Sequence, residues 1–210
     1  MQIIIMCGGE YKDFKKHKAL SVIKGEVLVE HTIRLLEENG IKDWYISATD
    51  PSFEKYGNIL KHKNTFKDNN GKIEGYWVDA YYPVSKPTIY LHGDVYYTDE
   101  AIKKILNLNP TKNTFIGNQW ALNEEHKKVG EPFGWIIVEP NKFFTAIEET
   151  KQLQDEGKVE RGVAISWELY EVLNGYDVND FIIDKETYLV LDEVFDIDSP
   201  EQIEQYKGVD

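Results

Sequence analysis

The order of strand, helix and strand at the start of the chain constrains the fold most. Residues 2–6 form an apolar run that stops before Gly8-Gly9, which is typical of a buried strand followed by a tight loop. Residues 28–36 carry an apolar stripe at helical spacing, and residues 43–48 alternate as a second strand does. Two strands joined through a helix pair in parallel with a right-handed crossover, so this opening predicts an α/β fold.

The remainder of the chain continues the pattern of strands and helices. We expect further strands at 88–91, 114–117, 135–138 and 188–191, and helices at 98–106, 141–156, 166–173 and from 199 onward. Ala19-Leu20 is expected to be extended, and residues 62–75 are expected to form a polar surface excursion. No internal repeat, linker or domain boundary interrupts the pattern, so we expect a single domain over residues 1–210.

Composition narrows the classes of function. The net charge is −13, and an acidic surface repels phosphate backbones, so nucleic acid and anionic membranes are poor partners. No apolar run approaches the roughly 18 residues that cross a bilayer. The first residues lack the features of a signal peptide. Cys7 is the only cysteine, which excludes an internal disulfide and predicts a cytoplasmic protein.

Positive charge gathers in one loop of this acidic chain. Lys12, Lys15, Lys16 and Lys18 lie within seven residues, just after the first expected strand. Two interpretations are open: a solvated basic loop, or a binding site for an anion such as a triphosphate.

Three groups of residues lie where ligands of open α/β sheets bind, at the expected strand ends. They are the glycine pair 8–9, Gly93-Asp94, and the pair Asp196 and Asp198 before the last helix. Glycines let backbone N–H groups approach phosphate oxygens, and separated aspartates suit Mg²⁺, which prefers hard oxygen ligands. Each group also has a structural explanation as a turn, a turn cap or an acidic helix start. Their coincidence beside the lysines favours a magnesium–nucleotide site.

Other phosphate and nucleophile motifs do not occur. The P-loop string G-x-x-x-x-G-K-[ST] is absent, and the residues after Gly8-Gly9 do not fit the dinucleotide fingerprint. No G-x-S-x-G string occurs, and Cys7 has no histidine next to it in the sequence. Cys7 therefore either lines a nucleotide or packs in the core.

The motifs occur in a familiar order. The strings IIIMCGG, HKAL and GEVLVEHTI occupy residues 3–33, LHGDV occupies 91–95, and FDIDSPE occupies 195–201. They resemble the A-G-G, P-K-x-L, G-x-P-L, L-x-G-D and D-I-D-T-P-E motifs of sugar-phosphate nucleotidyltransferases and molybdenum-cofactor guanylyltransferase-like proteins. The resemblance implies one Rossmann-like α/β domain with a mixed, mostly parallel sheet, flanking helices and a small acceptor-side β region.

Carried over position by position, the resemblance implies roles for individual residues. Gly8 and Gly9 would contact the nucleotide, and Lys18 would hold its phosphates as a catalytic residue. Asp94, also catalytic, and Asp198 would hold Mg²⁺. This makes Mg²⁺ the expected cofactor.

The chain departs from the family in the loop after the glycine pair. The family's x-G-T-R is replaced by residues 10–13, so the second loop glycine and the arginine are absent. Lys12 or Lys15 would supply the arginine's charge without its bidentate geometry. His17 stands where the family has proline. We expect these changes to alter the loop and the turnover more than the fold.

The implied reaction transfers a nucleoside monophosphate from an NTP to a small phosphorylated or similarly anionic acceptor, such as a sugar phosphate. An acceptor oxygen would attack the α-phosphorus in line and pyrophosphate would leave, with positioning and charge neutralisation supplying most of the catalysis. A phosphate nucleophile is already ionised, so the reaction requires no general base.

Three further positions complete the expectations. Asp196 would support Asp198 as a hydrogen-bond partner. Gly75 and Asp79 fall in the family's base-binding region and are candidate contacts to the base or ribose. Two alternatives stay open: a degenerate, non-catalytic nucleotide-binding module, and a nucleotide-sugar glycosyltransferase. The second is disfavoured because its D-x-D motif needs an aspartate where Tyr96 stands.

Overall fold

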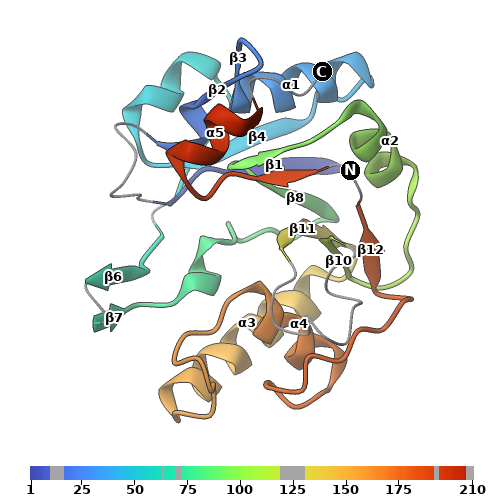
Figure 1. Cartoon of the computed structure of the whole chain (residues 1–210). Helices are drawn as coiled ribbons and strands as arrows, with labels where there is room; N and C mark the ends of the chain where they lie inside the picture. Colours follow the sequence, from blue (N-terminus) through green and yellow to red (C-terminus); the bar gives the residue numbers. More distant parts are fainter. Residues whose placement is uncertain (10–16, 63, 70–71, 119–130, 192–193, 207–210) are drawn as a thin grey trace.

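A seven-stranded sheet runs through the computed structural model, which describes residues 1–9, 17–62, 64–69, 72–118, 131–191 and 194–206 (Figure 1). The strand order is β12-β10-β11-β8-β1-β4-β5. The strands are β1 (Gln2–Met6), β4 (Trp44–Ala48), β5 (Ile59–Lys61), β8 (Thr88–His92), β10 (Thr114–Gly117), β11 (Pro132–Ile137) and β12 (Tyr188–Val190). β11 runs antiparallel to both of its neighbours, whereas the other neighbouring pairs are parallel. The sheet is therefore mixed and mostly parallel, as expected.

The opening unit of strand, helix and strand is confirmed. β1 pairs in parallel with β4, and α1 (Leu28–Glu38) connects them. The three isoleucines of β1 are buried on both faces of the sheet: Ile3 and Ile5 pack in one core cluster and Ile4 in another. A strand covered on both faces needs a continuous apolar run rather than an alternating one, which explains this sequence.

Helices cover the two faces of the sheet. α1 and α2 (Asp99–Asn107) supply buried side chains to the cluster that holds Ile3 and Ile5. α3 (Pro140–Asp155) and α4 (Ser166–Asn174) supply those of the cluster around Ile4. Figure 1 shows the same arrangement of layers. No helix among the described residues combines the length and the apolar character needed to cross a bilayer.

Several short elements lie outside the seven-stranded sheet. They are the two-stranded sheets β2 (Val22–Ile23) with β3 (Glu26–Val27), β6 (Lys67–Asn69) with β7 (Lys72–Glu74), and β9 (Val95–Tyr96) with β13 (Phe195–Asp196), the 3-10 helices η1 (Lys18–Leu20), η2 (Pro51–Tyr56) and η3 (Trp77–Ala80), and α5 (Pro200–Tyr206). The expectation that Ala19-Leu20 is extended was wrong, because His17 caps a 3-10 turn there by accepting a hydrogen bond from the Ala19 amide.

Candidate functional site

The ribbon of β9 and β13 brings two distant parts of the chain together. Val95 pairs with Asp196 in antiparallel register, and the Ile197 amide donates to the Asp94 carbonyl at 3.1 Å. Asp94 follows β8, one of the central parallel strands, so the ribbon carries Asp196 and Asp198 to the carboxyl end of the sheet.

Lys18 lies between two of the predicted aspartates. Its ammonium nitrogen is 3.0 Å from Asp198 Oδ1 and 3.7 Å from Asp94 Oδ2. The lysine side chain is only 6% exposed, whereas that of Asp198 is 59% exposed. The structure thus brings together Lys18, Asp94 and Asp198, three of the residues that the sequence predicts for phosphate and metal binding.

Glu131 joins this group, and sequence reasoning did not identify it. Carboxylate oxygens of Glu131, Asp196 and Asp198 lie within 4.8 Å of one another. Glu131 precedes β11, and no motif marks it. Its place follows from the antiparallel pairing of β11 with β8, which puts the start of β11 at the carboxyl end of β8. That pairing is a long-range contact, so local sequence patterns carry no signal for it.

The carboxylates perturb one another. Burial, followed by repulsion from Asp94 and Asp198, raises the pKa of Asp196 to about 9. Burial, followed by repulsion from Asp198 and Asp94, also raises the pKa of Glu131. Mutual repulsion among these carboxylates would be relieved by a bound cation. The donor set, composed of hard carboxylate oxygens, fits Mg²⁺.

The end of β1 packs tightly against the turn after β8. The Cys7 side chain is buried in the core, and burial, followed by the Asp94 charge, raises the pKa of its thiol well above the usual value. The side chain of Cys7 therefore packs in the core. A Cβ on Gly93 would lie 2.5 Å from Cys7 Sγ and 2.6 Å from the Met6 carbonyl oxygen, so this close approach requires glycine.

Gly8 has a different environment. The nearest described atom to an added Cβ would be Asn64 Cβ, at 3.7 Å, which is an ordinary contact distance. Packing among the described residues therefore does not explain the glycine at this position. The sequence analysis offers two reasons for the glycine pair, a turn and the close approach of a ligand to the backbone.

His17 lies next to Lys18, at the end of the lysine loop. Its ring accepts a hydrogen bond from the Ala19 amide at Nδ1 and packs edge-on against Phe53, with ring centroids 5.0 Å apart. Burial lowers the pKa of His17, although the negative charges of Asp94 and Asp50 act to raise it. A neutral histidine thus takes the place of the family's proline. Lys12 and Lys15 lie outside the described residues.

Gly75 and Asp79 have local partners. Gly75 has a φ of +71°, and a Cβ there would lie 2.4 Å from the Thr65 carbonyl oxygen, so backbone geometry explains it. Asp79 pairs with Lys151 at 2.5 Å and accepts a hydrogen bond from Thr65 Oγ1 at 2.7 Å. These contacts join η3 to α3, and a role in binding the base or ribose stays a prediction.

The scan against protein families and the search of curated proteins find no match. Solved structures do match. A protein assigned as a glucose-1-phosphate thymidylyltransferase from Bacillus anthracis, solved with sucrose, is 14% identical, with a TM-score of 0.55 over 98% of this chain and 93% of its own. The inositol-1-phosphate CTP transferase from T. maritima is 14% identical, with a TM-score of 0.54 over 99% and 96%. The CTP:phosphocholine cytidylyltransferase from Streptococcus pneumoniae is 15% identical, with a TM-score of 0.55 over 98% and 97%. The chain therefore shares its fold with nucleotidyltransferases.

Proposed function

We propose that this protein is a magnesium-dependent nucleotidyltransferase that transfers a nucleoside monophosphate from an NTP to a small phosphorylated or similarly anionic acceptor. One observation carries the proposal: the buried ammonium of Lys18 lies between Asp94 and Asp198 at the carboxyl end of the sheet. A lysine and separated carboxylates at this edge are what a metal-bound triphosphate requires. The nearly full-length likeness of fold supports the same class of reaction.

Each residue has a definite task in this proposal. Asp94 and Asp198 would hold Mg²⁺, which when bound neutralises phosphate charge. Lys18 would donate to phosphate oxygens of the NTP, and the backbone at Gly8 and Gly9 would approach the same phosphates without a Cβ in the way. The acceptor oxygen forms a bond to the α-phosphorus as the bond to the leaving pyrophosphate breaks, so charge neutralisation accounts for most of the rate.

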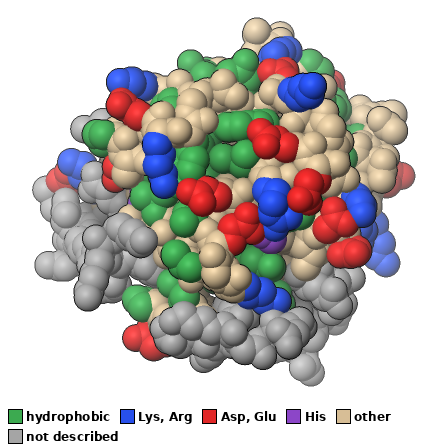
Figure 2. Space-filling model, turned by 90° about the horizontal axis from the view of Figure 1, so that it is seen from above, with side chains coloured by type: hydrophobic (Ala, Val, Ile, Leu, Met, Phe, Trp, Pro, Cys, Tyr) green, Lys and Arg blue, Asp and Glu red, His purple; other side chains and the backbone are tan. Residues whose placement is uncertain are grey.

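Charge also supports the choice of a small partner over a nucleic acid. A nucleic-acid surface needs a continuous basic stripe, whereas the chain carries a net charge of −13. On the face shown in Figure 2, Lys and Arg side chains of the described residues lie next to Asp and Glu side chains. Arg34, for example, pairs with Glu26 at 2.8 Å and with Glu38 at 3.1 Å.

A nucleotide-sugar glycosyltransferase fits less well. The second aspartate of its D-x-D motif would stand at position 96, where the Tyr96 ring stacks on His31 with centroids 4.3 Å apart. That ring offers no oxygen ligand comparable to a carboxylate.

The proposal is tested by measuring pyrophosphate release with each of the four NTPs, Mg²⁺ and a panel of acceptors containing sugar 1-phosphates, an inositol phosphate and phosphocholine. We expect release with one NTP and one acceptor class, abolished by EDTA. NTP-dependent thermal stabilisation without release in any combination would point to the degenerate binding module. If no NTP gives either thermal stabilisation or pyrophosphate release, nucleotide binding itself is contradicted.

A further inference from the structure

A buried hydroxyl lies beneath the turn that carries Asp94. Tyr97 is fully buried, and its hydroxyl accepts a hydrogen bond from the His92 amide at 3.0 Å. The same hydroxyl donates to the Phe133 carbonyl at 2.5 Å. The Tyr97 hydroxyl oxygen thus links His92, the last residue of β8, to Phe133 of β11. It also closes the loop of residues 92–97, because it bonds to the first residue of that loop.

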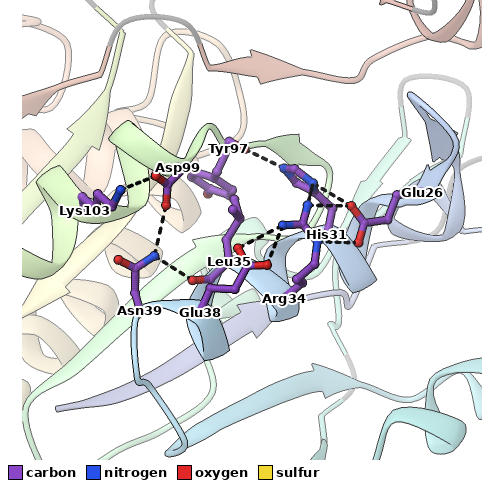
Figure 3. A network of polar contacts seen from close by, with 9 residues as sticks. All are labelled: Glu26, His31, Arg34, Leu35, Glu38, Asn39, Tyr97, Asp99 and Lys103. Carbon is purple, nitrogen blue, oxygen red and sulfur yellow. Dashed lines mark hydrogen bonds and ion pairs between the residues drawn. The ribbon is translucent and has the colours of Figure 1, made fainter.

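The backbone of Tyr97 is anchored as well. Its carbonyl oxygen lies 2.8 Å from His31 Nε2, and because a carbonyl only accepts, this nitrogen must carry the hydrogen. Figure 3 shows His31 on α1 in a network with Glu26 and Arg34, with the Tyr97 carbonyl on its other side. Tyr97 is therefore held at both ends, by the sheet through its hydroxyl and by α1 through its carbonyl.

These anchors bear on the carboxylates. Asp94 lies inside the loop that the hydroxyl closes, and Phe133 follows Glu131 by two residues. Burial, followed by the Asp94 charge, raises the pKa of Tyr97 well above its usual value, so the hydroxyl stays a donor at any ordinary pH. The neutral hydroxyl of Tyr97 thus adds a link between the Asp94 turn and the Glu131 segment to the pairing of β8 with β11.

We infer that Tyr97 is a positioning residue for the magnesium site, and that its hydroxyl holds the Asp94 turn and the Glu131 segment at the separation the metal requires. The inference rests on the proposed function. The ring alone could fill the core, and phenylalanine would do so equally well. The hydroxyl is the part that core packing does not explain, and without it the His92 amide loses this partner in a buried place.

The chain offers a matched control for this hydroxyl. Tyr90 also has a fully buried ring, lies on β8, and donates its hydroxyl to the Tyr82 carbonyl at 2.5 Å. Tyr90→Phe therefore removes a tyrosine hydroxyl that bonds to Tyr82, without touching the Asp94 turn. Two quantities are measured for the wild type, Tyr97→Phe and Tyr90→Phe. One is the affinity for Mn²⁺, obtained from the electron paramagnetic resonance signal of the free ion, and the other is the melting temperature.

We expect Tyr97→Phe to weaken Mn²⁺ binding by about tenfold or more, the usual loss when a group that orients metal ligands is removed. Tyr90→Phe should lower the melting temperature without changing Mn²⁺ affinity. Equal affinity in Tyr97→Phe and wild type, or an equal loss in Tyr90→Phe, would overturn the inference. If Tyr97→Phe does not fold, His31→Gln tests the other anchor, and unchanged Mn²⁺ affinity in that variant would overturn the inference too.

The transferase proposal is judged separately by pyrophosphate release. A wild-type protein that binds Mn²⁺ but transfers nothing would contradict the proposed reaction, and the ranking of the variants would still decide on Tyr97. A wild-type protein that binds no Mn²⁺ would overturn the positioning role together with the magnesium site.

Discussion

At the scale of single residues, Lys18 combines burial with two carboxylate partners, an arrangement that aligns its ammonium for a polyanion. We expect Lys18→Ala to lower turnover on the order of 100-fold, because charge stabilisation in a water-poor site is lost. Lys86→Ala is the control, since Lys86 forms an exposed ion pair with Asp43. Steady-state pyrophosphate release measures both variants. Equal rates in Lys18→Ala and Lys86→Ala would remove Lys18 from the site.

Asp196 and Asp198 differ in environment although they are two residues apart. Asp198 is exposed and contacts Lys18, and we expect Asp198→Asn to raise the magnesium concentration needed for half-maximal activity more than Asp196→Asn does. Asp196 is the more enclosed of the two and would act by supporting Asp198. Titration of Mg²⁺ against activity ranks the two variants, and the reverse order would give the ligand role to Asp196.

The raised pKa of Asp196 also predicts how metal-free stability depends on pH. The folded protein keeps the proton up to about pH 9, whereas the unfolded chain releases it near the usual pKa of about 4. The free energy of unfolding should therefore fall as pH rises between these values, because the folded state binds more protons. In EDTA, Asp196→Asn should be more stable than wild type at pH 8, with the gap closing toward pH 4. Thermal melts across this range test the slope, and parallel curves would contradict it.

At the scale of elements, two glycines lie after neighbouring strands and differ in what surrounds them. Gly93, after β8, is required by packing, whereas Gly8, after β1, has room for a side chain. We expect Gly93→Ala to cost about 1–3 kcal/mol of stability, because the new methyl group overlaps Cys7 and Met6. Gly8→Ala has room for its methyl group, so its melting temperature should stay near that of wild type while its KM for the NTP rises by about tenfold. Thermal melts and kinetics on both variants test this contrast. An unchanged KM in Gly8→Ala would show that the nucleotide does not approach there.

Local patterns predicted the elements that local contacts determine. The isoleucines of β1, the stripe of α1 and the Thr98 cap of α2 each carry their signal within a few residues. The helix expected from 199 onward begins with a capping box, in which the Ser199 amide donates to Gln202 Oε1 at 2.9 Å. The rule that ligands bind at carboxyl strand ends placed Asp94 and Asp198 on one edge of the sheet.

The rest of the site depends on contacts that no local pattern encodes. Because β11 is antiparallel to β8, Glu131 reaches the carboxylates and the Phe133 carbonyl reaches the Tyr97 hydroxyl. These residues look ordinary in the sequence, since their partners are chosen by the folded sheet.

At the scale of the whole molecule, ligand binding should register as stability. The folded chain alone assembles Lys18, Asp94 and Asp198, so Mg²⁺ with the correct NTP should stabilise it by about 2.7 kcal/mol at a hundredfold excess over Kd. We expect the melting temperature to rise with one NTP and Mg²⁺ and to stay constant with the same NTP in EDTA. An identical rise with all four NTPs would indicate binding through the phosphates alone.

The ribbon of β9 and β13 also sets the candidate site apart from the main sheet along the chain. The last strand of the main sheet ends at Val190, whereas Asp196 follows it and pairs with Val95, about a hundred residues earlier in the sequence. A chain cut just after β12 would therefore keep every strand of the main sheet and lose both Asp196 and Asp198.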